Sequence, residues 1–85
     1  MIVYVYREAN DDAPLTAEIV ETYYTRKKAE KRLREQVEKW AGVSFENVVK
    51  TLDFDNSDTF EKDYVSYCDL DGVCFIFSVT EMEVI

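Results

Sequence analysis

The side chains with the clearest chemical potential are the carboxylates of the C-terminal half. Between Asp53 and Glu83 the chain carries nine acids and a single base. Carboxylates held on a rigid sheet can imitate the phosphates of a nucleic acid, and charge complementarity then gives fast, salt-sensitive association with a basic surface. An acidic surface can also serve solubility alone, and this simpler interpretation stays open. The residues that we predict for a partner-binding surface are Asp53, Asp55, Asp58, Glu61, Asp63, Tyr64 and Tyr67.

Catalytic and metal-binding patterns are weak in this chain. It contains no His, which excludes a Cys–His nucleophile and a Cys/His zinc site. Asp53, Asp55 and Ser57 resemble the start of a calcium loop. However, Asp58 stands where that loop needs Gly, and Tyr64 stands where it needs a bidentate Glu. Because no Gly-rich phosphate loop or distinguished carboxylate pair is present, we expect no enzymatic activity, no cofactor and no bound metal.

The two cysteines lie on either side of an Asp71-Gly72 pair. Asp-Gly between apolar runs is typical of a two-residue hairpin turn, and this turn would pair Cys68 with Phe75. Cys68 and Cys74 would then point to opposite faces of the hairpin and could not be bridged. We therefore expect two free thiols that act as small apolar packing groups.

A second charged surface, of opposite sign, is predicted between residues 26 and 39. Seven of the ten basic residues fall in this stretch, together with three acids. The basic side chains that lie off its apolar stripe are Lys27, Lys28, Lys31, Arg34 and Lys39. They could face an anionic partner such as a nucleic acid, although the net charge of −8 opposes such binding. Alternatively, acids elsewhere in the chain and i,i+4 partners screen them, the predicted pairs being Glu30–Arg34 and Glu35–Lys39.

The same basic stretch has the apolar pattern of an amphipathic helix. Its apolar positions recur at helical spacing: Ala29, Leu33, Val37, Trp40 and Ala41. Thr25 suits the N-cap and Gly42 suits the left-handed residue after the last turn. The sequence therefore predicts a helix over residues 26–41. Residues 44–52 fit either a second, short helix or a strand, because Val48 and Val49 are β-branched.

The remaining segments are predicted to form two antiparallel hairpins. Their strands are residues 2–7, 17–24, 64–69 and 73–83, with polar loops at 8–16 and 53–63. We expect a single α+β domain over residues 1–85, with an antiparallel sheet of about four strands in the order ββααββ. The long helix would cover one face of this sheet. Because one helix cannot cover both faces, some of the six tyrosines, all in predicted strands, should line the other.

The chain shows no sign of membrane insertion or export. No apolar run approaches the ~18 residues of a membrane span. The N-terminus, MIVYVYRE, has no basic region ahead of a longer apolar stretch, as a signal peptide would. We therefore expect a cytoplasmic protein.

The first half of the chain resembles small, uncharacterised α+β proteins of phages and other mobile elements. The resemblance rests on the opening strand, Ile2 to Tyr6, and on a helix start of the form aromatic-Thr-x-Lys-x-Ala-Glu, here Tyr24 to Glu30. It implies an anti-CRISPR-like inhibitor, or nucleic acid mimic, that occupies a basic nucleic-acid-binding surface of a partner protein. We thus expect a non-enzymatic acidic binding protein. The alternatives are a homodimer of unknown housekeeping role and a nucleic-acid binder that uses helix 26–39.

Overall fold

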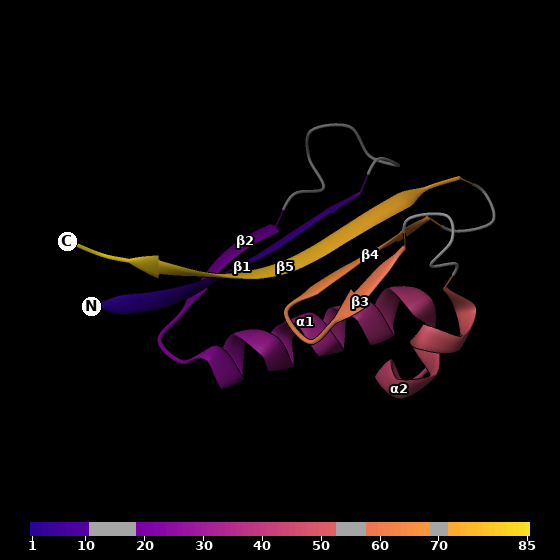
Figure 1. Cartoon of the computed structure of the whole chain (residues 1–85), viewed down its shortest axis with the longest axis horizontal. Coiled ribbons are helices and arrows are strands. Elements are labelled where there is room, and N and C mark those ends of the chain that lie inside the picture. The colour runs from indigo at the N-terminus through magenta and orange to yellow at the C-terminus, as the bar shows by residue number, and fades with distance from the viewer. Residues whose placement is uncertain (11–18, 53–57, 69–71) are drawn as a thin grey trace.

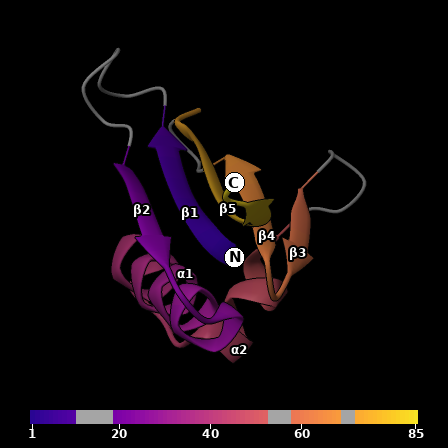
Figure 2. The same ribbon diagram turned by 90° about the vertical axis from the view of Figure 1, so that its left-hand side faces the viewer.

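Five antiparallel strands form one sheet in the computed structural model, which describes residues 1–10, 19–52, 58–68 and 72–85. The strands are β1 (Ile2–Asn10), β2 (Ile19–Tyr23), β3 (Thr59–Glu61), β4 (Tyr64–Cys68) and β5 (Cys74–Glu83). They lie side by side in the order β2-β1-β5-β4-β3 (Figure 2). The α+β class is confirmed, and so are both predicted hairpins, because β1 pairs with β2 and β4 with β5.

The predicted count of four strands is corrected to five by β3, which lies inside the segment predicted to be an acidic loop. This strand has three residues and pairs with β4. Its one apolar residue, Phe60, packs with its ring centroid 4.7 Å from that of Phe45. A strand with a single apolar position has no alternating pattern, so periodicity could not reveal it.

The long helix, α1 (Arg26–Ala41), runs across one face of the sheet (Figures 1 and 2). Its predicted ends are confirmed. Thr25 Oγ1 accepts a hydrogen bond from the backbone N–H of Lys28 at 3.2 Å. Gly42 has a φ of 74° and donates its N–H to the carbonyl of Glu38 at 2.9 Å, which ends the helix.

A short helix, α2 (Phe45–Val48), and a 3₁₀ turn, η1 (Val49–Thr51), follow α1 directly. The alternative that residues 44–52 form a strand is therefore wrong. Val48 is buried in the core, and the short element lies beside the C-terminal end of α1 (Figure 1).

The core lies between α1 and the sheet face that α1 covers. Its buried members are Tyr6, Ala29, Leu33, Val37, Val48, Val65, Tyr67, Phe75, Phe77 and Val79. Three rings form a row across β4 and β5, with centroids 5.3 Å apart for Tyr67–Phe75 and 6.2 Å apart for Phe75–Phe77. Such offset aromatic contacts add stability beyond the area that they bury.

A buried carboxylate, that of Glu8, connects this core to the helix. Glu8 is 1% exposed, although the sequence predicted a loop from this residue onward. Its Oε1 accepts hydrogen bonds from the Tyr6 hydroxyl at 2.6 Å and from Gln36 Nε2 at 2.8 Å. Its Oε2 accepts one from the Trp40 indole N–H at 3.0 Å. Burial, together with the hydrogen bond to Glu8, raises the pKa of the Tyr6 hydroxyl above its ordinary value.

The tyrosines lie mostly on the helix side of the sheet, so the expectation that some line the other face is met by a single described residue. Strand alternation places Tyr4, Tyr6, Tyr23 and Tyr67 on the covered face, and Tyr24 lies outside the strands. Among the tyrosines, only Tyr64 lies on the uncovered face of the described sheet. Apolar side chains exposed on that face are Val20, Ile76 and Met82.

The cysteines form a disulfide, so the prediction of two free thiols was wrong. Cys68 pairs with Cys74 across β4 and β5, and their Cα atoms are 3.9 Å apart. The connection is therefore longer than the two-residue turn expected from Asp71-Gly72. This change in register brings both cysteines onto the same face.

Within the described residues, no helix is both long and apolar enough to cross a bilayer.

Removal of the Glu8 carboxylate should destabilise the fold more than removal of an exposed carboxylate. Glu8→Ala leaves the donors of Tyr6, Gln36 and Trp40 without their acceptor, and we expect a loss of about 3 kcal/mol. Urea unfolding followed by Trp40 fluorescence measures this loss. The matched control is Glu61→Ala, on an exposed strand position, which should change stability by less than about 0.5 kcal/mol. Equal effects of the two variants would contradict the role of Glu8.

Thiol counting tests the corrected hairpin register. The unfolded, unreduced protein should present no free thiol, and two should appear after reduction. Cys68→Ser combined with Cys74→Ser should lower the free energy of unfolding by about 2 kcal/mol, because the short closed loop regains entropy when unfolded. Two free thiols before reduction would contradict the disulfide and support the register predicted from the sequence.

Candidate functional site

The residues predicted to bind a partner do not all meet on one surface. Asp53 and Asp55 lie outside the described residues. Glu61 and Tyr64 are direct cross-strand neighbours on the uncovered face, where Tyr64 is 37% exposed. Asp63 lies in the turn between β3 and β4, with Oδ2 3.9 Å from Arg26 Nη1.

Tyr67 is the one predicted anchor that the structure removes from the surface. It is only 9% exposed, and its ring stacks with those of Phe75 and Phe77 on the sheet face that α1 covers. Tyr64 and Tyr67 are three positions apart, so alternation sends their side chains to opposite faces. Asp58 immediately precedes β3 and is partly buried.

The charge is divided between the described body and the remaining segments. All ten bases and eleven of the eighteen acids belong to the described residues, so this body has a net charge near −1. Segments 11–18, 53–57 and 69–71 contain the other seven acids and no base. The strand residues nearest to these segments lie toward one end of the sheet: Asn10, Ile19, Thr59, Cys68 and Cys74. The acid surplus is therefore attached to one end of a nearly neutral body.

The basic side of α1 is partly neutralised by acids from other elements. Arg26 lies 3.5 Å from Glu81 and 3.9 Å from both Glu30 and Asp63. Arg34 pairs with Glu46 on α2. This confirms the expected screening within the molecule.

The helical pairs themselves differ from the predicted ones. Glu30 pairs with Arg26 at 3.9 Å rather than with Arg34, and Glu35 pairs with Lys31 at 4.0 Å rather than with Lys39. Both observed pairs have i,i+4 spacing with the base first, which is the less favourable orientation on a helix.

The best-formed ion pair joins α1 to the edge strand β2. Arg32 Nε donates to Glu21 Oε1 at 2.7 Å, and the Tyr23 hydroxyl donates to the same oxygen at 2.9 Å. The hydrogen bond from Arg32 holds the pKa of Glu21 below its ordinary value, with a smaller contribution from Tyr23. Burial raises the pKa of the Tyr23 hydroxyl, and its bond to Glu21 adds to the shift.

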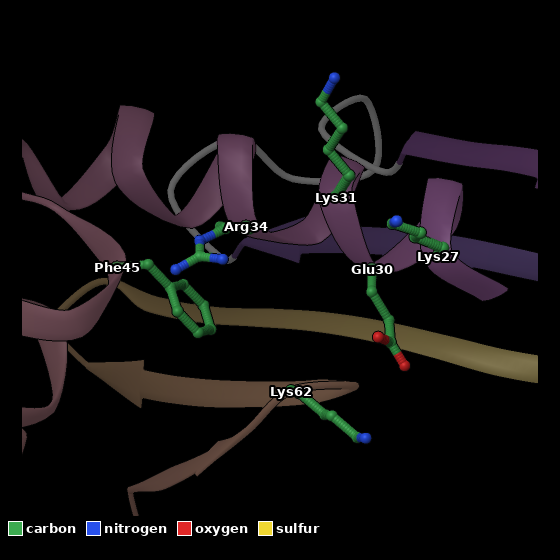
Figure 3. Close-up of a pocket in the computed structure, with 6 residues that line it drawn as sticks. All are labelled: Lys27, Glu30, Lys31, Arg34, Phe45 and Lys62. Atoms are coloured by element: carbon green, nitrogen blue, oxygen red, sulfur yellow. The ribbon is translucent and has the colours of Figure 1, made fainter.

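A groove of about 300 Å³ lies between α1, α2 and the turn that joins β3 to β4 (Figure 3). Its lining residues are Lys27, Glu30, Lys31, Arg34, Phe45 and Lys62. The four from α1 have the spacing i, i+3, i+4 and i+7, which puts them on one side of the helix. α1, the α2 helix that follows it and the β3–β4 turn thus place three cations, one carboxylate and one ring along the groove, while the charged end of Lys31 points away from it (Figure 3).

The cations of the groove differ in how far they are already paired. Arg34 pairs with Glu46 and its guanidinium carbon lies 5.2 Å from the centre of the Phe45 ring. Lys31 has only a long and exposed contact with Glu35. Within the described part of the chain, Lys27 and Lys62 have no ion-pair partner. The sequence had indicated the basic helix but not Lys62 or Phe45, since no local pattern relates them to it.

Comparison with known proteins gives no family. No protein-family model, curated protein or solved structure matches this chain. The resemblance to phage-type inhibitors therefore stays a prediction from the sequence.

The low pKa of Glu21 predicts a pH-dependent contribution to stability. Because the folded-state pKa lies below the unfolded one, the ion pair stabilises the fold above about pH 4.5, and this stabilisation is lost as the pH falls through the folded-state pKa. Glu21 is about one-third exposed, so Glu21→Gln should cost less than about 1 kcal/mol at pH 7. Urea unfolding should show that the loss of stability caused by Glu21→Gln is smaller at pH 3 than at pH 7. Arg32→Gln should show the same decrease. A cost that is the same at both pH values would contradict the shifted pKa.

Proposed function

We propose that this chain is a non-enzymatic binding protein whose acidic end docks onto a basic, nucleic-acid-binding surface of a partner protein. The observation that carries the proposal is the charge distribution. Segments 11–18, 53–57 and 69–71 contain seven acids and no base. They attach to one end of the described body, whose own net charge is near −1. A concentrated surplus of one sign steers a partner of the opposite sign, whereas evenly spread charge mainly keeps a protein soluble.

The uncovered face of the β3–β4 hairpin supplies an exposed aromatic residue beside an acid. Glu61 and Tyr64 are opposite each other in the register, and no ion pair joins Glu61 to another described residue. Tyrosine contributes contact area and a hydroxyl at interfaces, while a neighbouring carboxylate can pair with Lys or Arg of the partner. Of the predicted residues, we retain Glu61 and Tyr64 for this hairpin face and Asp53, Asp55 and Asp58 for the acidic end, whereas Asp63 is already paired with Arg26.

The resemblance to phage-type proteins supports the kind of partner that we propose. Small acidic proteins that occupy a basic surface compete with the nucleic acid for it. The partner would then be a nucleic-acid-handling protein, and its complex with this chain would weaken as the salt concentration rises.

A homodimer that forms through the uncovered face of the sheet is the second candidate. Val20, Ile76 and Met82 are 52%, 45% and 44% exposed on this face. Exposed apolar side chains on a sheet face favour an interface with another protein surface. Light scattering across a concentration series separates the two candidates, since a dimer that persists at nanomolar concentration favours the second.

Affinity capture from bacterial lysate tests the first candidate. The full chain should retain a nucleic-acid-binding protein at low salt and release it at high salt or on addition of a DNA or RNA oligonucleotide. Asp53→Asn, Asp55→Asn and Glu61→Gln combined should weaken capture about tenfold or more.

The matched control for this capture removes three charges from the helical side. Glu35→Gln, Glu46→Gln and Glu83→Gln combined give the same net charge and should retain the partner. The proposal fails if no salt-sensitive partner is captured, or if the two triple variants lose it to the same extent.

A further inference from the structure

We infer that the groove between α1, α2 and the β3–β4 turn binds a small organic phosphate that carries a ring, such as a mononucleotide. This site is of opposite sign to the acidic end, and the inference does not depend on the proposed function. Four observations support it: the size of the groove, its cations, its unsatisfied carboxylate oxygen and its distance from the acid surplus.

The groove has the dimensions of a small-molecule site. Its volume of about 300 Å³ lies at the lower end of the range for ligand pockets, which suits one nucleotide rather than a polymer. Its walls combine the aliphatic stems of lysines with the ring of Phe45 (Figure 3). Such walls accommodate a flat apolar group while the charged ends of the side chains remain available.

The cations suit a phosphate monoester, which carries a charge of about −1.5 to −2 near pH 7. Lys27 and Lys62 have no ion-pair partner in the described chain, and they come from α1 and from the β3–β4 turn. Arg34 is held by Glu46 and offers further N–H donors at the Phe45 side. A phosphate in the groove would therefore meet donors from two elements, which an isolated exposed lysine cannot provide.

The carboxylate of Glu30 provides a contact for the rest of the ligand. Its Oε1 is buried and, within the described residues, accepts no hydrogen bond; Arg26 Nη1 lies 3.9 Å away. A buried acceptor without a donor is unfavourable, so the Glu30 side chain, which is 23% exposed, gains if it turns this oxygen toward a ligand N–H in the groove. An exocyclic amine on a nucleobase is such a donor, whereas inorganic phosphate has none.

The net charge of the chain does not prevent this binding. The turn that contains Lys62 lies at one end of β4, and Cys68, next to an acidic segment, lies at the other end. Four strand steps separate these ends by about 13 Å. This exceeds the screening length of about 8 Å at physiological salt. Two acids near the groove, Asp63 and Glu81, are already paired with Arg26.

NMR titration of the ¹⁵N-labelled full chain tests the inference with three probes: adenosine monophosphate, inorganic phosphate and adenosine. Adenosine monophosphate should shift the amide signals of groove residues, including Lys27, Phe45 and Lys62, and should bind at least about fivefold more tightly than either other probe. Lys27→Gln combined with Lys62→Gln should weaken its binding about tenfold.

The matched control is Lys28→Gln combined with Lys50→Gln, which removes two exposed lysines outside the groove. It should weaken binding less than about twofold. Equal losses in the two double variants would show attraction to general positive charge and would overturn the site. Equal affinity for adenosine monophosphate and inorganic phosphate would overturn the assigned ligand class, and shifts confined to other residues would overturn the location.

Discussion

The hydrogen bonds of the buried Glu8 carboxylate determine where the long helix lies on the sheet. One acid on β1 receives donors from Tyr6 on its own strand and from Gln36 and Trp40 on α1. Apolar packing holds the helix on this face but discriminates little between neighbouring positions along it. A buried acceptor with three directed donors does favour one helix position. In a shifted position the Glu8 carboxylate and the donors of Gln36 and Trp40 would lose their hydrogen bonds.

The position of α1 in turn creates the two charged regions of the molecule. It brings Lys27 and Arg34 beside α2 and the β3–β4 turn, where they line the groove. It also brings Arg26 and Arg32 onto acids of the sheet, which neutralises much of the described body. The acidic residues that remain unbalanced are concentrated in the segments outside the described residues. The described body thus carries a groove lined by basic residues, and the acid surplus belongs to segments attached at one end of it.

Features encoded by local patterns could be predicted from the sequence, and those that depend on tertiary contacts could not. Thr25 and Gly42 marked both ends of α1 because capping is a local interaction. Glu8 resembled the start of a loop, since its donors on α1 lie 28 and 32 residues away. The pairing of Cys68 with Cys74 was missed because the Asp-Gly rule predicts a tighter turn than this hairpin has. The candidate groove was predicted only as one basic helix face.

The indole N–H of Trp40, the only tryptophan of the chain, reports directly on the contact between the helix and Glu8. Its ring is about half exposed, yet its N–H donates to Glu8 Oε2 at 3.0 Å. Hydrogen exchange of this single indole proton, followed by NMR, is therefore the most direct measurement. If Glu8 anchors α1, the indole proton should exchange much more slowly than that of free tryptophan, and Glu8→Gln should accelerate it. Exchange at the rate of a free indole in the native protein would contradict this account.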